Sequence, residues 1–177
     1  MKRAVLVFLT LGVFTAVVFA LDGMTAGVKW TVPGSWKLQA TRPMRVATYD
    51  VPAAPGSDPG ECGVFYFGTG QGGGVDENIN RWVQQFENAP PAKKSEKTVG
   101  GLKVHLVEVS GTYLAPSGPM MQSSGKKPNS RLLGAIVEAP HGLVFFKCVG
   151  PAATITKAQS DFDHLVASLV KSTGTAL

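Results

Sequence analysis

The chain has 177 residues and a formal net charge of +5, and 44% of its residues are hydrophobic while 16% are charged. A chain of this length suits one domain with one sizeable core. The basic excess is small and no aromatic residues interleave with its clusters, so the sequence does not predict a nucleic-acid surface.

The N-terminus has the three parts of a secretory signal peptide. A basic start at Met1, Lys2 and Arg3 precedes an apolar run over residues 4–20, which ends in Val-Phe-Ala. We therefore expect residues 1–20 to be removed and residues 21–177 to form a single exported domain, periplasmic or extracellular. The alternative is a retained anchor, but the run sits at the lower limit for spanning a bilayer. We expect no stable membrane insertion after cleavage.

The first part of the mature chain predicts short strands. Trp30 and Trp36 flank a Pro-Gly-Ser turn, which is typical of two strand-like segments. Residues 44–51 alternate well enough to form a further strand. Residues 62–67 are apolar on both faces of a strand, which predicts a central position in a sheet.

A glycine-rich loop and a helix follow this central strand. Residues 68–74 contain five glycines, and the helix is expected to begin near Asp76, which could cap it. Glu77 and Arg81 are spaced as an i,i+4 ion pair on its wet face. The apolar stripe of the helix comprises Val75, Ile79, Trp82, Val83 and Phe86.

The second half predicts more strands and a final helix. Residues 93–97 are predicted as a charged loop, residues 103–113 as a long strand, and residues 115–130 as the longest unstructured stretch. Residues 131–139 and 143–149 are predicted as a hairpin. The last helix is expected to open at Thr156. This order predicts an α+β domain with a largely antiparallel sheet of about six strands and two main helices packed on it.

Two segments carry a resemblance to a known family. Pro33-Gly34-Ser35-Trp36 resembles the early segment of the PsbP-like α/β/α sandwich family. Residues 143–154, followed by Phe162 and Ser168-Leu169, resemble the family's closing strand, loop and helix. The resemblance implies a non-catalytic domain that binds another protein or supports a larger assembly. It supplies no catalytic motif, and the glycine-rich loop is not a general feature of the family.

Cys62 and Cys148 are compatible with two states. An exported chain permits a disulfide, and both cysteines fall in predicted strands. They could equally be buried thiols that pack as small hydrophobic groups. No metal site is predicted, because there is no CxxC pair and the histidines lack ligand spacing: His105, His141 and His164.

The glycine loop is the first candidate site. Residues 68–73 fit G-x-G-x-x-G, but Glu87 ends the helix instead of the next strand, so no dinucleotide or other cofactor is expected. Backbone amides at the helix start could hold a carboxylate or phosphate, or the glycines could simply form a turn with positive φ angles. The candidate residues are Gly70, Gln71, Gly72, Gly73, Gly74, Asn78 and Arg81.

The stretch 115–130 is the second candidate site, with Met120 and Met121 beside Lys126 and Lys127. An adaptable apolar patch next to positive charge suits protein contacts, although a loop without a role is the alternative. We therefore expect a non-enzymatic binding or accessory protein that contacts a cell-envelope protein through the 68–75 glycine loop and the 115–130 loop. The alternatives are a small anion bound at residues 70–76, or a hydrolase without a recognisable motif.

Overall fold

The computed structural model describes residues 22–117 and 122–172, so the predicted signal peptide, Met120 and Met121 lie outside the described residues. The described chain forms two antiparallel sheets and three helices. The helices are α1 Val75–Val83, α2 Ala152–Lys157 and α3 Gln159–Ala167. The small sheet has the order β1-β2-β11, with β1 Asp22–Thr25, β2 Val28–Thr31 and β11 Val170–Lys171. Among the described residues, no helix has the length and apolar character needed to cross a membrane.

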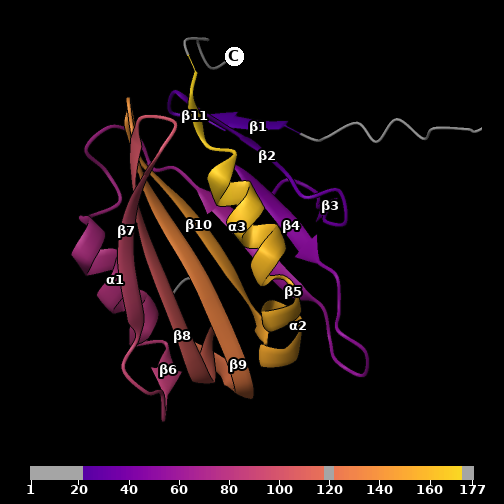
Figure 1. Ribbon diagram of the computed structural model, residues 1–177. Coiled ribbons are helices and arrows are strands. Elements are labelled where there is room, and N and C mark those ends of the chain that lie inside the picture. The colour runs from indigo at the N-terminus through magenta and orange to yellow at the C-terminus, as the bar shows by residue number, and fades with distance from the viewer. Residues whose placement is uncertain (1–21, 118–121, 173–177) are drawn as a thin grey trace, which may run out of the picture.

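The large sheet has eight strands in the order β3-β4-β5-β10-β9-β8-β6, and β7 also pairs with β8. Figure 1 shows α2 and α3 lying along one face of this sheet, apart from α1. The strands are β3 Lys37–Leu38, β4 Ala47–Val51, β5 Gly60–Phe65, β6 Phe86–Glu87, β7 Lys93–Val99, β8 Leu102–Ser117, β9 Gln122–Ala139 and β10 Gly142–Pro151.

Both faces of the large sheet carry an apolar core, because alternate residues of a strand point to opposite faces. On β10, Val144 and Phe146 pack in the core beneath α2 and α3, where Leu165 is fully buried. Phe145 lies in a second core with Trp82 of α1. We call the face that α1 covers the second face.

The structure joins Cys62 and Cys148 by a disulfide. The two residues stand directly opposite each other on β5 and β10, with their Cα atoms 3.9 Å apart. Of the two states that the sequence left open, the structure therefore has the paired one. The bond links two central strands that are 86 residues apart in the chain.

The α+β class and the largely antiparallel sheet are confirmed, but the predicted number of about six strands is wrong, because the large sheet has eight and a separate sheet has three. Residues 93–97 belong to β7, an edge strand whose charged side chains face solvent. The stretch 115–130 is also not a loop in its described part, since β8 runs to Ser117 and β9 starts at Gln122. Backbone pairing with bulges accommodates the Pro and Gly residues there.

The helix boundaries also differ from the prediction. Asp76 does not cap α1, because Gly74 is the N-cap residue and its N–H donates to the Glu77 carboxylate at 3.4 Å. Thr156 does not open the last helix, since α2 begins at Ala152 and a break at Ala158 separates it from α3. The predicted ion pair between Glu77 and Arg81 is confirmed at 2.9 Å.

Reduction of the disulfide should destabilise the domain. A cross-link that closes such a long loop restricts the unfolded chain, so we expect a loss of about 2–4 kcal/mol in the free energy of unfolding. Urea unfolding with and without a reductant measures this change. The double variant Cys62→Ala/Cys148→Ala is the control and should not respond to the reductant. An equal midpoint for oxidised and reduced wild-type protein would contradict the prediction.

Candidate functional site

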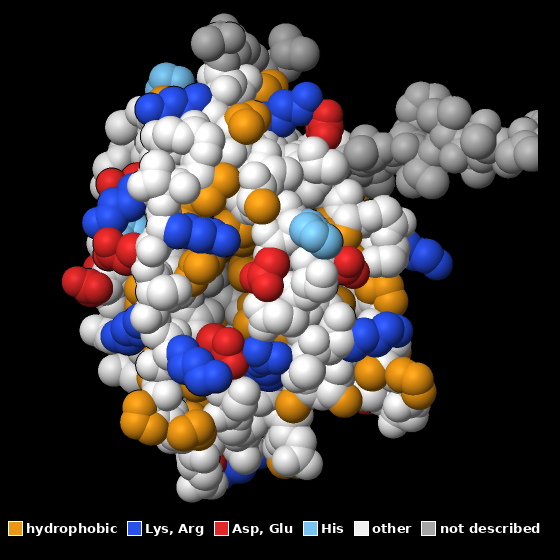
Figure 2. Space-filling view, in the orientation of Figure 1, with side chains coloured by type: hydrophobic (Ala, Val, Ile, Leu, Met, Phe, Trp, Pro, Cys, Tyr) orange, Lys and Arg blue, Asp and Glu red, His pale blue; other side chains and the backbone are white. Residues whose placement is uncertain are grey.

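α1 covers only part of the second face. Its Trp82 ring rests on Gly134 of β9, where an added Cβ would lie 2.5 Å from the Trp82 Cζ3 atom. Because α1 has nine residues, it shields β8 and β9 but leaves part of β5 and β10 open. On the opposite face, around α3, charges of both signs are interspersed and hydrophobic side chains form small groups (Figure 2).

A cleft of about 260 Å³ lies between α1 and the uncovered strands. It follows a row of residues across three strands, in which Lys147 of β10 stands between Gly63 of β5 and Gly134 of β9. Because the two glycines have no side chains, the rings of Trp82 and Phe65 pack directly onto the sheet on either side of the lysine. Phe65, Phe67, Trp82, Phe145 and Val149 supply the apolar walls, and Arg45, Glu61, Asn78, Arg81, Gln85, Tyr113 and Lys147 supply the polar groups.

The Lys147 ammonium is half-buried in this cleft. It donates to the Gln85 side-chain carbonyl at 2.5 Å and to the Tyr113 hydroxyl at 3.3 Å, and it lies 5.4 Å from the centre of the Tyr113 ring. Burial, and then repulsion from Arg45, lowers the pKa of Lys147 to about 8, although Glu61 opposes the shift. Burial in the cleft therefore disfavours the charged form of the Lys147 amine in the folded protein.

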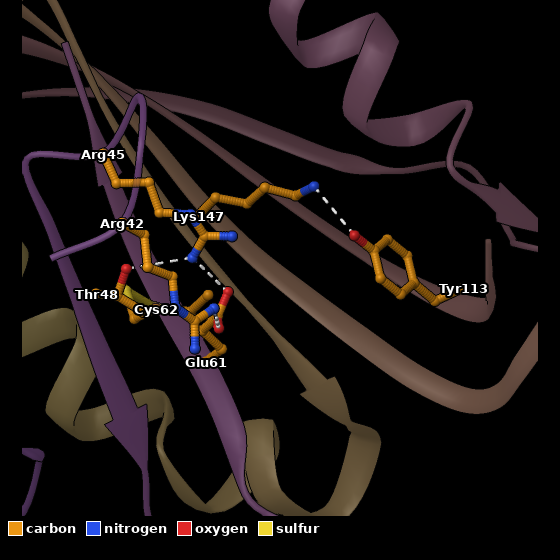
Figure 3. A network of polar contacts seen from close by, with 8 residues as sticks. Arg42, Arg45, Thr48, Glu61, Cys62, Tyr113 and Lys147 are labelled. Carbon is orange, nitrogen blue, oxygen red and sulfur yellow. Dashed lines mark hydrogen bonds and ion pairs between the residues drawn. A yellow bond between two sulfur atoms is a disulfide. The ribbon is translucent and has the colours of Figure 1, made fainter. Parts of the chain in front are cut away.

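Arg45 and Arg42 converge on Glu61 beside the lysine (Figure 3). The Arg45 guanidinium lies 2.5 Å from one Glu61 oxygen, and the Arg42 guanidinium lies 2.7 Å from the other. Arg45 also sits over the Phe65 ring, 5.3 Å from its centre. The Glu61 carboxylate is thus paired with two arginines, and it acts on Lys147 without forming an ion pair with it.

Tyr113 completes the polar end of the cleft. Its hydroxyl receives a hydrogen bond from Lys147, and Figure 3 shows the amine reaching across the sheet to it. Burial, and then the Glu61 charge, raises the pKa of Tyr113 to about 12. The hydroxyl therefore keeps its proton at neutral pH and can donate a hydrogen bond of its own.

A second hollow of about 690 Å³ continues from the cleft towards the ends of β8 and β9. The two share Arg45, Glu61, Tyr113 and Val149. We call the cleft and this hollow together the sheet groove.

The structure brings four of the described sequence-predicted site residues to the sheet groove. Asn78 and Arg81 line the cleft, and Lys126 and Lys127 line the hollow. The predicted loop residues, which do not line the groove, are Gly70, Gln71, Gly72, Gly73 and Gly74.

The polar groups at the start of α1 bond largely among themselves. The Asn78 amide donates to the carbonyls of Gly72 and Gly74, and the Gly74 N–H donates to Glu77. The glycine loop is also fixed to the β9–β10 turn, because the Thr69 hydroxyl donates to the His141 carbonyl at 2.8 Å. This geometry gives the loop a structural role in seating α1.

Sequence reasoning missed Arg45, Glu61, Tyr113 and Lys147. One signal was available, since Lys147 interrupts the apolar run of residues 143–149, and a charge in a buried strand needs a partner or a role.

His105 lies on β8, away from the lining of the groove, and its two ring nitrogens contact Glu96 and Glu138 at 2.8 and 2.7 Å. In the described ranges, no group of His, Cys, Asp and Glu residues is placed to hold a metal ion.

Comparison with known proteins identifies the fold. A Pseudomonas aeruginosa protein of unknown function matches with a TM-score of 0.52 and 11% identity, over 88% of this chain and 99% of that one. The solution structure of cyanobacterial PsbP from Synechocystis matches with a TM-score of 0.51 and 14% identity, over 91% and 98%. No family model and no curated protein matches the chain. The chain has a PsbP-like fold, as its two terminal segments indicated.

Replacing Lys147 by Met should stabilise the protein at neutral pH. The folded-state pKa of about 8 lies below the unfolded value of 10.5, so below pH 8 the folded state carries the full cost of the buried charge. The free energy of unfolding of the wild type should rise between pH 8 and 10.5, because in that range Lys147 is protonated in the unfolded state and neutral in the folded state. We expect Lys147→Met to gain about 1–3 kcal/mol at pH 7 and less at pH 9.5.

Urea unfolding of both proteins at the two pH values measures this difference. Lys93→Met is the matched control, because the Lys93 side chain is 82% exposed, and it should change stability little at either pH. A Lys147→Met variant less stable than the wild type at pH 7 would contradict the prediction.

Proposed function

We propose that the chain is an exported, non-enzymatic binding domain that contacts a protein partner in the cell envelope through the sheet groove. The observation that carries the proposal is the incomplete cover of the second face, which leaves aromatic and charged side chains around a groove. The groove runs from Phe67, beside the glycine loop, to Lys126 and Lys127 on β9. It therefore includes Lys126 and Lys127 of the second predicted contact segment and ends beside the first, the glycine loop.

Two features favour binding over hydrolysis. With a pKa of about 8, Lys147 is mainly protonated at neutral pH, and its contacts Gln85 and Tyr113 are not general bases there. His105 is engaged by two carboxylates on neighbouring strands. Export is supported by the signal-like N-terminus and by the disulfide, because oxidising compartments preserve such bonds.

Capture from the envelope fraction of the native organism tests the proposed contact. Phe67 is 39% exposed at the rim of the cleft, and Lys127 lies exposed at the far end of the groove. Phe67→Ala and Lys127→Glu should each reduce recovery of a stoichiometric partner by about tenfold or more, because aromatic and charged anchors dominate interfaces.

Matched controls lie on other surfaces. Val170→Ala removes a side chain of comparable exposure from β11, and Lys93→Glu reverses an exposed charge on β7. Both should leave capture unchanged. Equal capture by all four variants would overturn the groove as the contact surface.

Export predicts a defined N-terminus. Protein isolated from the native organism should begin at Leu21, because the Val-Phe-Ala segment ends at Ala20. Intact-mass spectrometry of the envelope fraction measures this end directly. Recovery of a chain that retains residues 1–20 would contradict export with cleavage.

A further inference from the structure

We propose that the cleft beside α1 binds a small organic acid, whose carboxylate is held by Lys147 and whose apolar part packs against Phe67, Trp82 and Phe145. This ligand site lies within the sheet groove, and the proposal stands whether or not a protein partner binds there. The argument rests on charge, on hydrogen-bond donors and on the size of the cleft.

The positively charged side chains of the cleft differ in whether they form an ion pair with a carboxylate. Arg45 pairs with Glu61, and Arg81 pairs with Glu77. Within residues 22–117 and 122–172, no carboxylate lies within ion-pair distance of the Lys147 amine, whose contacts are two neutral groups. Among the described residues, Lys147 is therefore the cation of the lining without a carboxylate partner, and the carboxylate of a ligand would supply one.

The free donors also suit a carboxylate. An ammonium has three N–H donors, and Lys147 uses two of them on Gln85 and Tyr113. The third N–H and the Tyr113 hydroxyl proton are available to two oxygens of one ligand. A hydrogen bond between an ammonium and a carboxylate is charge-assisted and stronger than either bond that the amine now makes.

The shape of the cleft limits the ligand. A volume of about 260 Å³ with aromatic walls accommodates one ring or a short aliphatic chain, and it is too small for a dinucleotide. The Phe67 and Phe145 rings lie 5.8 Å apart, and Trp82 meets Phe145 edge-on at 6.4 Å. A phosphate group fits less well, because Lys147 and Tyr113 leave two hydrogen-bond donors free and a phosphate presents three oxygens.

The proposal makes binding dependent on pH. The charged and titratable groups around Lys147 are Arg45 before β4, Glu61 on β5, Arg81 on α1 and Tyr113 on β8. A bound carboxylate would favour the protonated amine, whose pKa in the free cleft is about 8. Affinity should therefore be constant between about pH 6 and 7, where the ligand is ionised, and fall about tenfold by pH 9 as the free amine loses its proton.

NMR titration of the folded mature protein tests the site, with phenylacetate as the probe. We expect saturable shifts at Phe145, Lys147 and Gln85 below about 20 mM, and at least tenfold weaker binding of the neutral analogue phenylacetamide. Lys147→Met should lose at least tenfold in affinity, whereas Lys93→Met should bind as the wild type does. The Lys147→Met variant is expected to be folded, so loss of binding reports on the charge.

Four results would overturn the proposal. These are no shifts with phenylacetate, equal binding of phenylacetamide, undiminished binding by Lys147→Met, or tighter binding of phenyl phosphate. The blocked dipeptide N-acetyl-aspartyl-phenylalaninamide distinguishes the source of the carboxylate. If only the dipeptide binds, the cleft receives a partner's acidic side chain and the free acid is excluded. Failure of the ligand titration leaves the capture experiment intact, so the two proposals can fail separately.

Discussion

The alternation of side chains along β10 is the constraint on which the rest of the structure depends. Val144, Phe146 and Cys148 point into the core beneath α2 and α3, while Phe145 and Lys147 point to the second face. A shift of one residue in register would exchange these two sets and place the ammonium in the larger core. The Cys62–Cys148 disulfide fixes the β5–β10 register directly beside Lys147.

That register also determines which residues surround the cleft on the second face. Two glycines flank Lys147 on the neighbouring strands, and the Trp82 ring of α1 occupies the space above one of them. The other lies beneath the Phe65 ring and the Arg45 side chain. The glycines therefore let two aromatic rings rest on the sheet beside Lys147, and burial of that lysine disfavours its charged form in the free protein. A destabilising charged side chain in an open cleft is typical of a functional site, because binding sites retain groups that lower the stability of the free protein.

The sequence predicted the parts of the fold that local pattern determines. The hairpin of β9 and β10 has apolar residues on both faces and a Gly-containing turn, so its strands were recognised. The edge strand β7 was missed because charged residues resemble a loop, although edge strands carry such residues to prevent aggregation. The cleft could not be predicted, because Glu61, Tyr113 and Lys147 are brought together only by the pairing of β5, β10, β9 and β8.

The central claim is that the second face holds an uncompensated, partly buried ammonium at Lys147. The most direct test is the pKa of that amine, followed by NMR of its ε-carbon and ζ-nitrogen as the pH is raised in the folded protein. The account predicts a midpoint near 8, where burial and Arg45 place it. A midpoint near the ordinary lysine value of 10.5 would contradict it, because the amine would then be solvated or paired and would offer no free charge to a ligand.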